Sequence, residues 1–419
     1  MSGLRFCMLT TFYPPHHFGG DAIGIQRLAR GLVRHGHHVT VVHDVDAFES
    51  LYTGPPRRDA GEPEGLDVIP LRSGHRKLSP LLTQQLGRPT LQAKRLRNIL
   101  DDGDFDVINF HNISLMGGPG ILKYGDAVKL YMAHEHWLVC PSHVLWRHNR
   151  ELCTGKQCLR CVAAYRRPPQ YWRYTGLLER EGRHVDTFIA MSQFSRDKHA
   201  EFGFPYPMEV LPYFLPDDEG SATPPARPQE APYFLFVGRL EPIKGLDDVI
   251  PVFRDYPDAE LLIAGDGTYG DVLRAQAAGI ERVRFLGRLT PEELAAYYAH
   301  ALALIVPSVC YETFGIILIE SFTHGTPVIA RRIGPFPEIV EASGGGELFS
   351  NEDELKVAMR RIQSDPEHRE RLSVAGKAAR KRLWSESAVI PRYLDLVRNA
   401  AKRRGNSRVL DALTERVSA

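Results

Sequence analysis

The chain has 419 residues, of which 43% are hydrophobic and 25% charged. This composition is that of a globular protein, and it excludes a disordered chain, a fibre and a disulfide-stapled mini-protein; the length suggests two to four domains. Residues 1–215 carry 26 basic and 21 acidic side chains, whereas residues 216–419 carry 26 basic and 30 acidic ones, so the two halves differ in charge.

No apolar run reaches the roughly 20 residues that cross a bilayer. The opening MSGLRFCMLT leads directly into a strand-like stretch without a cleavable signal. We therefore expect a cytoplasmic protein.

In the first half, apolar runs of strand length alternate with helix-length amphipathic stretches. This alternation is typical of a parallel α/β fold. The strands that it predicts are Leu4–Thr10, Val39–His43, Val107–Phe110, Lys129–Ala133 and Phe188–Met191.

A Pro-rich and acidic stretch then indicates a linker at 216–231, after which the alternation resumes. The second set of predicted strands is Tyr233–Val237, Leu261–Ala264, Val283–Leu286, Ala303–Val306 and Val328–Ala330. Thr290 before Pro291 predicts a helix start there, and the last fifty residues are expected to be helical. The expected domains are therefore 1–215 and 232–385, followed by a helical segment, 386–419, that can cross back to the first domain.

Three motifs in strand-to-helix junctions suit a phosphorylated ligand. Gly19 and Gly20 follow the first strand, where glycines let backbone N–H groups approach an anion, although a tight turn without a ligand is an equal alternative. In FLFVGRLEPIKG, Arg239 and Lys244 follow a strand of the second half, where parallel sheets bind phosphates; the alternative is a pair of surface ion-pair partners. Such cations can replace a divalent metal at a diphosphate, and no Asp-x-Asp dyad stands at a suitable strand end, so no catalytic metal is expected.

The third motif is ETFGIILIE, in which Glu312 and Glu320 flank a glycine and an apolar run. A helix beginning near Gly315 would leave Glu312 in the preceding loop and place Glu320 in its second turn. A carboxylate within an apolar helix is costly unless it is paired, so Glu320 is expected to have a partner. Free N–H groups near Phe314 and Gly315 would face oxygens of the same ligand.

Over most of its length, and most strongly from Phe234 to Glu341, the chain resembles the retaining GT-B glycosyltransferases of the large bacterial group 1, or family four. FVGRLEPIKG, LLIAGDG, VRFLGRL, the two-glutamate motif and GTPVIARRIGPFPEIV carry the resemblance, and YPPHHFGGD with RHGHHVTVV adds to it near the N-terminus. It implies the GT-B fold, with two Rossmann-like doubly wound parallel-sheet domains facing an interdomain cleft.

The resemblance also implies roles for these residues. Arg239 and Lys244 would hold the donor diphosphate, with Gly19 and Gly20 approaching the same region. Glu320 would bind the ribose hydroxyls. Glu312 and the amides of Phe314 and Gly315 would hold the transferred sugar.

In LYMAHEHW, His134 corresponds to the family's histidine near the sugar and the reacting centre. Glu135 stands where Asp is commoner. His111 is a second histidine at a strand end, and His16 and His17 are candidates for contact with the acceptor. Apart from the resemblance, a lone histidine such as His134 is more often a structural residue. VLPYFLPDD replaces the usual Asn-Gly-Val-Asp turn.

Four cysteines cluster after His134, within an insertion at about 137–170. Their spacing, with a Cys-x2-Cys pair and two further thiols, fits tetrahedral zinc; unligated thiols, an iron–sulfur cluster and disulfides are the alternatives. We expect structural zinc at Cys140, Cys153, Cys158 and Cys161.

Between residues 145 and 183, nine basic residues, among them Arg166 and Arg167, are interleaved with five Trp and Tyr rings and oppose three acids. Such a surface suits an anionic acceptor and contact with an anionic membrane; a solvated basic face is the alternative. Nucleic acid is not the expected partner, because the cysteines lie beside the expected sugar site.

The sequence therefore predicts a retaining transferase that moves a hexosyl unit from a nucleoside diphosphate sugar to a hydroxyl acceptor. The alternatives are an epimerase or an inverting transferase of the same fold, and a non-catalytic protein that binds a sugar nucleotide or nucleic acid.

Overall fold

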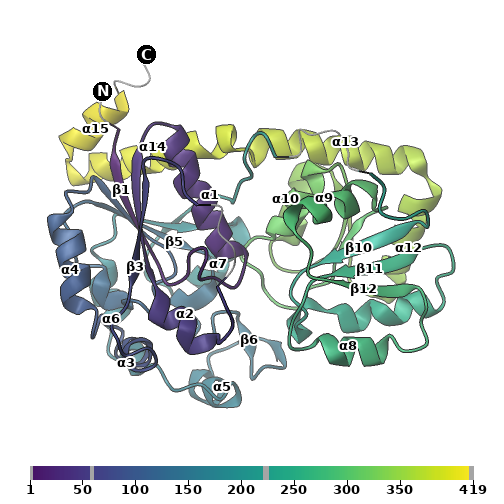
Figure 1. Ribbon diagram of the computed structural model, residues 1–419, viewed down its shortest axis with the longest axis horizontal. Helices are drawn as coiled ribbons and strands as arrows, with labels where there is room; N and C mark the ends of the chain where they lie inside the picture. The colour runs from purple at the N-terminus through teal and green to yellow at the C-terminus, as the bar shows by residue number, and fades with distance from the viewer. Residues whose placement is uncertain (1–2, 57–60, 220–225, 415–419) are drawn as a thin grey trace. The chain divides into compact units, whose positions relative to one another are not determined.

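The computed structural model describes residues 3–56, 61–219 and 226–414. It divides into two compact units, Met1–Tyr213 with Val389–Ala419, and Phe214–Ala388 (Figure 1). The sequence placed the domain boundaries at 215 and 386. Of the linker expected at 216–231, residues 220–225 lie outside the described residues.

The first unit contains a seven-stranded parallel sheet of order β3-β2-β1-β4-β5-β8-β9. All five strands predicted for the first half are confirmed to within one residue at either end. The strands are β1 (Arg5–Thr10), β2 (His38–Asp44), β3 (Leu66–Leu71), β4 (Val107–Phe110), β5 (Val128–Ala133), β8 (Thr187–Ala190) and β9 (Met208–Val210). A separate antiparallel hairpin pairs β6 (Trp146–Arg147) with β7 (Glu151–Leu152).

The helices of the first unit include a C-terminal pair. They are α1 (Gly20–Arg34), α2 (Val45–Leu51), α3 (Leu78–Leu86), α4 (Ala93–Asp102), α5 (Cys158–Ala164), α6 (Leu177–Gly182), α7 (Gln193–Glu201), α14 (Glu386–Arg404) from Val389 on, and α15 (Ser407–Thr414), with the 3₁₀ turns η1 (Pro119–Ile121), η2 (His136–Leu138) and η3 (Tyr171–Tyr174). Asn109 Nδ2 in β4 donates to Tyr393 Oη in α14 at 3.0 Å, and Arg403 Nη2 donates to the carbonyl of Asp186 at 2.9 Å. The C-terminal helices thus pack on the first sheet.

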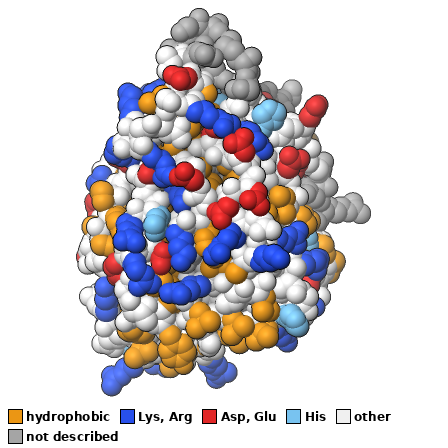
Figure 2. Space-filling model, turned by 90° about the vertical axis from the view of Figure 1, so that its left-hand side faces the viewer, with side chains coloured by type: hydrophobic (Ala, Val, Ile, Leu, Met, Phe, Trp, Pro, Cys, Tyr) orange, Lys and Arg blue, Asp and Glu red, His pale blue; other side chains and the backbone are white. Residues whose placement is uncertain are grey.

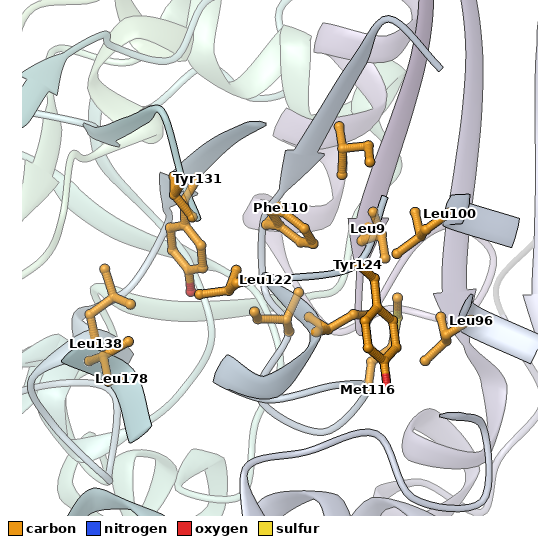
Figure 3. Packing of buried hydrophobic residues seen from close by; sticks show 14 of the residues in the cluster. Leu9, Leu96, Leu100, Phe110, Met116, Leu122, Tyr124, Tyr131, Leu138 and Leu178 are labelled. Carbon is orange, nitrogen blue, oxygen red and sulfur yellow. The ribbon is translucent and has the colours of Figure 1, made fainter. Parts of the chain in front are cut away.

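One buried apolar cluster fills the space between this sheet and α4. Leu9 and Phe110 on neighbouring strands lie between Tyr131 and Leu100, and Met116, Leu122 and Tyr124 extend the cluster (Figure 3). Burial of such side chains contributes about 1.5–3 kcal/mol each relative to leaving them exposed. This core fixes the carboxyl ends of β4 and β5, where His111 and His134 follow.

The second unit contains a six-stranded parallel sheet of order β12-β11-β10-β13-β14-β15. Its five predicted strands are confirmed, again to within one residue. The strands are β10 (Tyr233–Val237), β11 (Glu260–Ala264), β12 (Val283–Gly287), β13 (Leu304–Val306), β14 (Val328–Arg331) and β15 (Gly346–Phe349).

Helices cover both faces of this second sheet: α9 and α10 lie on one side and α8 on the other (Figure 1). The helices are α8 (Gly270–Gln276), α9 (Pro291–His300), α10 (Ile316–Thr323), α11 (Phe336–Ser343), α12 (Glu352–Ser364) and α13 (Pro366–Leu383), with the 3₁₀ turns η4 (Pro242–Lys244), η5 (Leu246–Asp248) and η6 (Ile250–Arg254). The predicted helix start is confirmed: Thr290 Oγ1 accepts from the Glu293 amide at 3.2 Å, and Glu293 Oε2 accepts from the Thr290 amide at 2.8 Å.

The two ends of the second unit lie together. The amide of Leu215 donates to the carbonyl of Trp384 at 2.9 Å, and the amide of Glu386 donates to the carbonyl of Leu215 at 3.1 Å. The chain therefore enters and leaves this unit at one place.

The helices α13, α14 and α15 confirm the predicted helices up to Thr414, the last described residue. In the part of the chain that the structure describes, no helix combines the length and the apolar character that a membrane span requires.

Candidate functional site

In the second unit, the turns that follow β10 and β13 pack directly on each other. Gly245 has φ +72°, and a Cβ there would lie 2.1 Å from the carbonyl oxygen of Pro307. Only glycine fits this left-handed and crowded position. The contact brings Lys244, at the end of η4, to the segment that carries Glu312.

Lys244 and Glu312 form an ion pair with an Nζ to Oε1 distance of 2.6 Å. Ser308 Oγ donates to the same carboxylate oxygen at 3.1 Å. The two charged side chains are 21% and 25% exposed, so the pair is partly shielded and still accessible to a ligand. Two residues that the sequence placed in separate motifs thus form one polar group.

Burial and the ion pair act in opposite directions on both residues. Burial alone lowers the pKa of Lys244, but the Glu312 carboxylate outweighs it, so that the pKa of Lys244 is raised. Burial alone raises the pKa of Glu312, but Lys244, Ser308 and Arg239 lower the pKa of this carboxyl below its usual value. Both groups are therefore charged at neutral pH.

Arg239 is exposed at the end of the β10 turn, where its Nη1 lies 2.9 Å from Glu241 Oε1. It is close enough to influence the pKa of both Lys244 and Glu312. The structure therefore gathers Arg239, Lys244 and Glu312 at one edge of the sheet.

Helix α10 begins directly after Gly315, as the sequence predicted. Gly315 has φ +124°, and a Cβ there would lie 2.8 Å from the ring of Phe336, so glycine is required. The N-cap residue provides no side-chain hydrogen bond to this helix, and a helix start of this kind can present N–H groups to a ligand. Phe314 is buried, with its ring centroid 6.5 Å from that of Trp384, and Glu320 lies half-buried in the second turn.

The glycine pair of the first unit lies at the start of α1. Gly19 is its N-cap residue, in an extended conformation, and Gly20 is its first residue. Among the described residues, and leaving its chain neighbours aside, a Cβ on Gly19 would have one atom within 4 Å, Asp21 Oδ1 at 3.9 Å, and the N-cap residue provides no side-chain hydrogen bond to the helix. The position therefore has room for a group other than the protein's own side chains.

The two histidines at the ends of β4 and β5 contact each other. His111 Nδ1 lies 2.8 Å from His134 Nε2, and the rings stack with centroids 5.1 Å apart. On its other side, His134 Nδ1 lies 2.5 Å from the hydroxyl of Tyr213. Burial lowers the pKa of His134 to about 3, and burial with the neighbouring His134 lowers the pKa of His111 well below its usual value. Both imidazoles are therefore neutral at pH 7.

These contacts occupy both ring nitrogens of His134. Within the described residues, His111 Nε2 is buried without a hydrogen-bond partner. An unpaired buried N–H is rarer than an unpaired acceptor, which favours donation from His111 Nδ1 to His134 Nε2 and from His134 Nδ1 to the Tyr213 oxygen. The Tyr213 hydroxyl then accepts this hydrogen bond and keeps its own proton as a donor.

Tyr213 was missed by the sequence reasoning, which noted only that its segment departs from the usual turn. Its ring packs on Gly24 in the interior of α1, where a Cβ would lie 2.3 Å from the ring. A glycine inside a helix costs about 1 kcal/mol relative to alanine, so Gly24 was the available signal of a close contact. Burial raises the pKa of Tyr213 well above its usual value, and the charges of Asp21 and Glu135 raise it further. Tyr213 therefore lies near both the start of α1 and the end of β5.

Gly24→Ala is expected to displace the ring of Tyr213 and to destabilise the protein by about 1–3 kcal/mol, because the added Cβ overpacks this contact. Thermal unfolding measures the loss. In a Tyr213→Ala background the same change should cost little, since the ring that the Cβ meets is absent. An equal loss in both backgrounds would contradict this account.

The remaining candidate residues lie elsewhere in the first unit. The His143 Nδ1 lies 2.8 Å from Glu135 Oε1, in the loop that follows His134. His16 stacks on His43 with centroids 5.4 Å apart, and His17 Nδ1 lies 3.3 Å from the carbonyl of Gly19. Of the two candidates for acceptor contact, His17 thus lies beside Gly19, whereas His16 packs on His43.

The four cysteines line one small cavity, together with Arg147 and Lys156. Within the described residues, no group of three or more His, Cys, Asp or Glu side chains has the arrangement of a metal site. Zinc binding accordingly stays a prediction.

Several known proteins are similar to this chain over most of its length. It is 28% identical over 404 residues to a glycogen synthase of Mycobacterium tuberculosis, with 91% of each chain covered. It is 24% identical to a GDP-mannose-dependent alpha-(1-6)-phosphatidylinositol monomannoside mannosyltransferase of Mycolicibacterium smegmatis, covering 88% of this chain and 92% of that protein.

Among solved structures, the sucrose-phosphate synthase of Thermosynechococcus elongatus has a TM-score of 0.70 at 19% identity, covering 94% of this chain and 98% of that one. HepE of Anabaena in complex with UDP-glucose has a TM-score of 0.64 at 17% identity, with 96% and 99% covered. Together with the two parallel-sheet units, these similarities show the GT-B fold.

Two family models match adjoining parts of the sequence. The model of Glycosyltransferase Family 4 matches residues 18–219, and the model of glycosyl transferases group 1 matches residues 219–381. Because the two matches together span residues 18–381, this chain belongs to the group 1 glycosyltransferases.

Proposed function

We propose that this glycosyltransferase moves a hexosyl unit from a nucleoside diphosphate sugar to a hydroxyl acceptor with retention of the anomeric configuration. The observation that carries the proposal is the group formed by Arg239, Lys244 and Glu312 at the carboxyl edge of the second sheet. Open α/β sheets bind ligands at this edge, and two cations beside the uncapped start of α10 suit a diphosphate.

Each residue of this group has a role in the proposal. Lys244 and Arg239 hold the diphosphate, and Glu312, whose carboxylate stays ionised, accepts hydrogen bonds from sugar hydroxyls. The Phe314 and Gly315 amides donate to the same sugar, and Glu320 accepts from the ribose. Gly19 and Gly20 contribute amides to the phosphates, and His134 acts near the transferred sugar through its chain with Tyr213.

In the proposed reaction, the bond between the anomeric carbon and the phosphate oxygen breaks while the acceptor oxygen bonds to the same face of that carbon. The departing phosphate oxygen takes the proton of the acceptor hydroxyl. Because Lys244 and Arg239 stabilise the negative charge that develops on the leaving diphosphate, the reaction needs no catalytic metal.

The named relatives support a nucleotide-sugar donor but differ in its base. One solved relative holds UDP-glucose, and a curated relative is named for dependence on GDP-mannose. A screen of UDP-, GDP- and ADP-sugars by calorimetry, followed by acceptor trials with the tightest donor, tests the proposal. A glycosylated product of unchanged anomeric configuration is expected. Inversion, an epimerised donor or binding without turnover would each overturn it.

The basic insertion lies beside exposed apolar side chains, which supports a membrane-associated acceptor. Within the described residues, nine of the twelve large hydrophobic side chains that are exposed come from α2, α3, α5, η3 and adjoining turns: Leu51, Tyr52, Leu78, Leu81, Leu86, Leu91, Leu159, Tyr171 and Tyr174. Hydrogen bonds join these elements, since Trp172 Nε1 donates to the carbonyl of Gln84 at 3.0 Å and Arg76 Nε to that of Glu49 at 2.8 Å.

Figure 2 shows the face that carries α3 and α4, where Lys and Arg side chains gather in a band with hydrophobic side chains below it. Arg166 and Arg167 are exposed just after α5. Apolar side chains beside cations suit the headgroup region of an anionic membrane. We propose that the acceptor is presented there.

Reversing the charge of Arg166 and Arg167 to Glu is expected to weaken binding to phosphatidylglycerol vesicles by about 2 kcal/mol or more, since each cation near such a surface contributes about 1 kcal/mol. Cosedimentation at several salt concentrations measures it, with nucleotide affinity unchanged. The matched control, Lys356→Glu with Arg360→Glu on α12, should leave vesicle binding intact. If both double variants bind vesicles equally well, the basic surface does not bind membranes and is a solvated face.

A further inference from the structure

The four clustered cysteines come from three separate elements of the insertion. Cys140 follows η2, Cys153 follows β7, and Cys158 and Cys161 lie in the first turn of α5. All four border one cavity of about 20 Å³, a volume that accommodates a single small species. Chain segments up to 21 residues apart thus converge through their thiols.

The β6–β7 hairpin is shaped to hold this arrangement. His148 and Asn149 at its tip both have positive φ, 54° and 59°, which is the geometry of a tight hairpin turn. The turn aims the His148 amide at Cys161 Sγ, 3.3 Å away. Backbone N–H groups that donate to sulfur stabilise a thiolate, as ligand-supporting hydrogen bonds do around metals.

Cations surround the thiols. Arg147 and Lys156 line the cavity. The guanidinium of Arg173 lies close enough to Cys140 and Cys158 to interact with their charges. It donates to the carbonyls of Trp137 at 2.6 Å and Leu138 at 3.4 Å and to Gln170, and none of the ion pairs within the described residues includes it. Arg147, Lys156 and Arg173 would therefore lie beside a metal ion bound by the four cysteines.

One divalent ion satisfies all of these features. Four thiolates with a divalent cation carry a net charge of −2, which Lys156 and Arg173 can balance, since Arg147 already pairs with Glu151 at 2.7 Å. In the described residues, the four sulfur atoms do not have the arrangement of a metal site. A rotation about χ1 moves each sulfur to another staggered position. Zinc binds four thiolates at Zn–S distances of about 2.3 Å. We propose that Cys140, Cys153, Cys158 and Cys161 bind one structural Zn²⁺ that positions the segment from His134 to His143.

The hydrogen bonds of this segment show how the metal would act on the candidate site. The Cys140 amide donates to the His136 carbonyl at 2.8 Å, and the His136 amide donates to the His143 carbonyl at 2.9 Å. His143 in turn lies 2.8 Å from Glu135. Fixing Cys140 therefore fixes the loop that begins at His134, without contact between the metal and the substrate.

Metal analysis of the intact protein, purified without chelator or added metal, is the first test. We expect about one zinc per chain, released when an organomercurial modifies the thiols. Protein that is demetallated and reloaded with Co²⁺ alone should show the intense ligand-field bands and the sulfur-to-cobalt charge transfer of a tetrahedral thiolate site. Neither measurement depends on activity or on a variant.

Cys158→Ser with Cys161→Ser should lose zinc and lower kcat, while nucleotide affinity stays unchanged, because none of the residues proposed to hold the nucleotide lies in the insertion. Cys7→Ala, which removes a buried thiol of β1 outside the cluster, should keep one zinc. Failure of the donor screen would overturn the proposed function and leave these metal readouts intact.

Three results would overturn the zinc site. They are protein without metal whose six thiols are all titrated as free, iron in place of zinc, and a disulfide among the four cysteines in protein prepared anaerobically. A Co²⁺ spectrum without thiolate charge transfer would equally exclude this ligand set.

Discussion

Lys244→Ala is expected to weaken binding of the donor nucleotide by about 2–5 kcal/mol, because the change removes a charge that is partly shielded from water and leaves its partner Glu312 unpaired. This corresponds to a Kd roughly 30-fold higher or more. Arg239→Ala should have a smaller effect, since this side chain is more exposed and already pairs with Glu241. Calorimetric titration with the free nucleoside diphosphate measures both.

Lys356→Ala is the matched control, because this lysine belongs to the same unit and pairs with Glu352 on the surface of α12. Its replacement should leave nucleotide affinity unchanged. If the Lys244 and Arg239 variants bind the nucleotide as tightly as this control does, the diphosphate does not bind at this edge of the sheet.

The ion pair has a further effect on the Lys244 variant. In Lys244→Ala, the Glu312 carboxylate still accepts a hydrogen bond from Ser308 but has lost the positive charge opposite it. Adding Glu312→Gln then removes this unpaired negative charge. The two changes should therefore be non-additive in thermal stability, with a coupling of about 0.5–3 kcal/mol. Additive losses would mean that the 2.6 Å contact contributes nothing to the folded protein.

His134→Ala is expected to reduce kcat about 100-fold with little change in nucleotide affinity, because displacement of a positioned group by about 1 Å already has an effect of that size. Tyr213→Phe keeps the ring on Gly24 and removes only the hydroxyl that contacts His134. It should lower kcat in the same direction and leave the thermal stability close to that of the unchanged protein.

The neutral state of these histidines gives this prediction a pH signature. Since the pKa of His134 is lowered to about 3 by burial, the proton is gained only well below neutrality. The pH profile of kcat should therefore contain no step near pH 6.5 that comes from His134, that is, no step that is lost in His134→Asn. Such a step would contradict the lowered pKa of His134. Full activity in both Tyr213→Phe and His134→Ala would assign His134 to folding alone.

Local sequence was sufficient to predict the central strands and the edge strand β12, but not the three other edge strands, β3, β9 and β15. Central parallel strands are apolar on both faces, so runs such as Val107–Phe110 were recognisable. The edge strand β3 carries Asp67 and Pro70 among its six residues, and β15 has only four residues that begin with glycine. Their apolar signal is interrupted or short, which is why these strands were missed.

The candidate site shows the same limit at the level of side chains. Glu312 and Lys244 were recognised from their motifs, but their mutual ion pair depends on the contact between Gly245 and Pro307, which no local pattern encodes. Tyr213 lies 79 residues after His134 and contacts it only in the folded unit. Motifs indicate which groups are available, whereas long-range packing decides which of them meet.

The meeting of the two ends of the second unit at Leu215 and Trp384 has a consequence for biosynthesis. Residues 214–388 form one uninterrupted segment, which can fold as soon as it leaves the ribosome, whereas the first unit consists of two segments separated by it. Until α14 is made, Asn109 lacks its Tyr393 partner and the sheet lacks the helices that cover it. The first unit therefore completes its folding last, although its own strands are synthesised first.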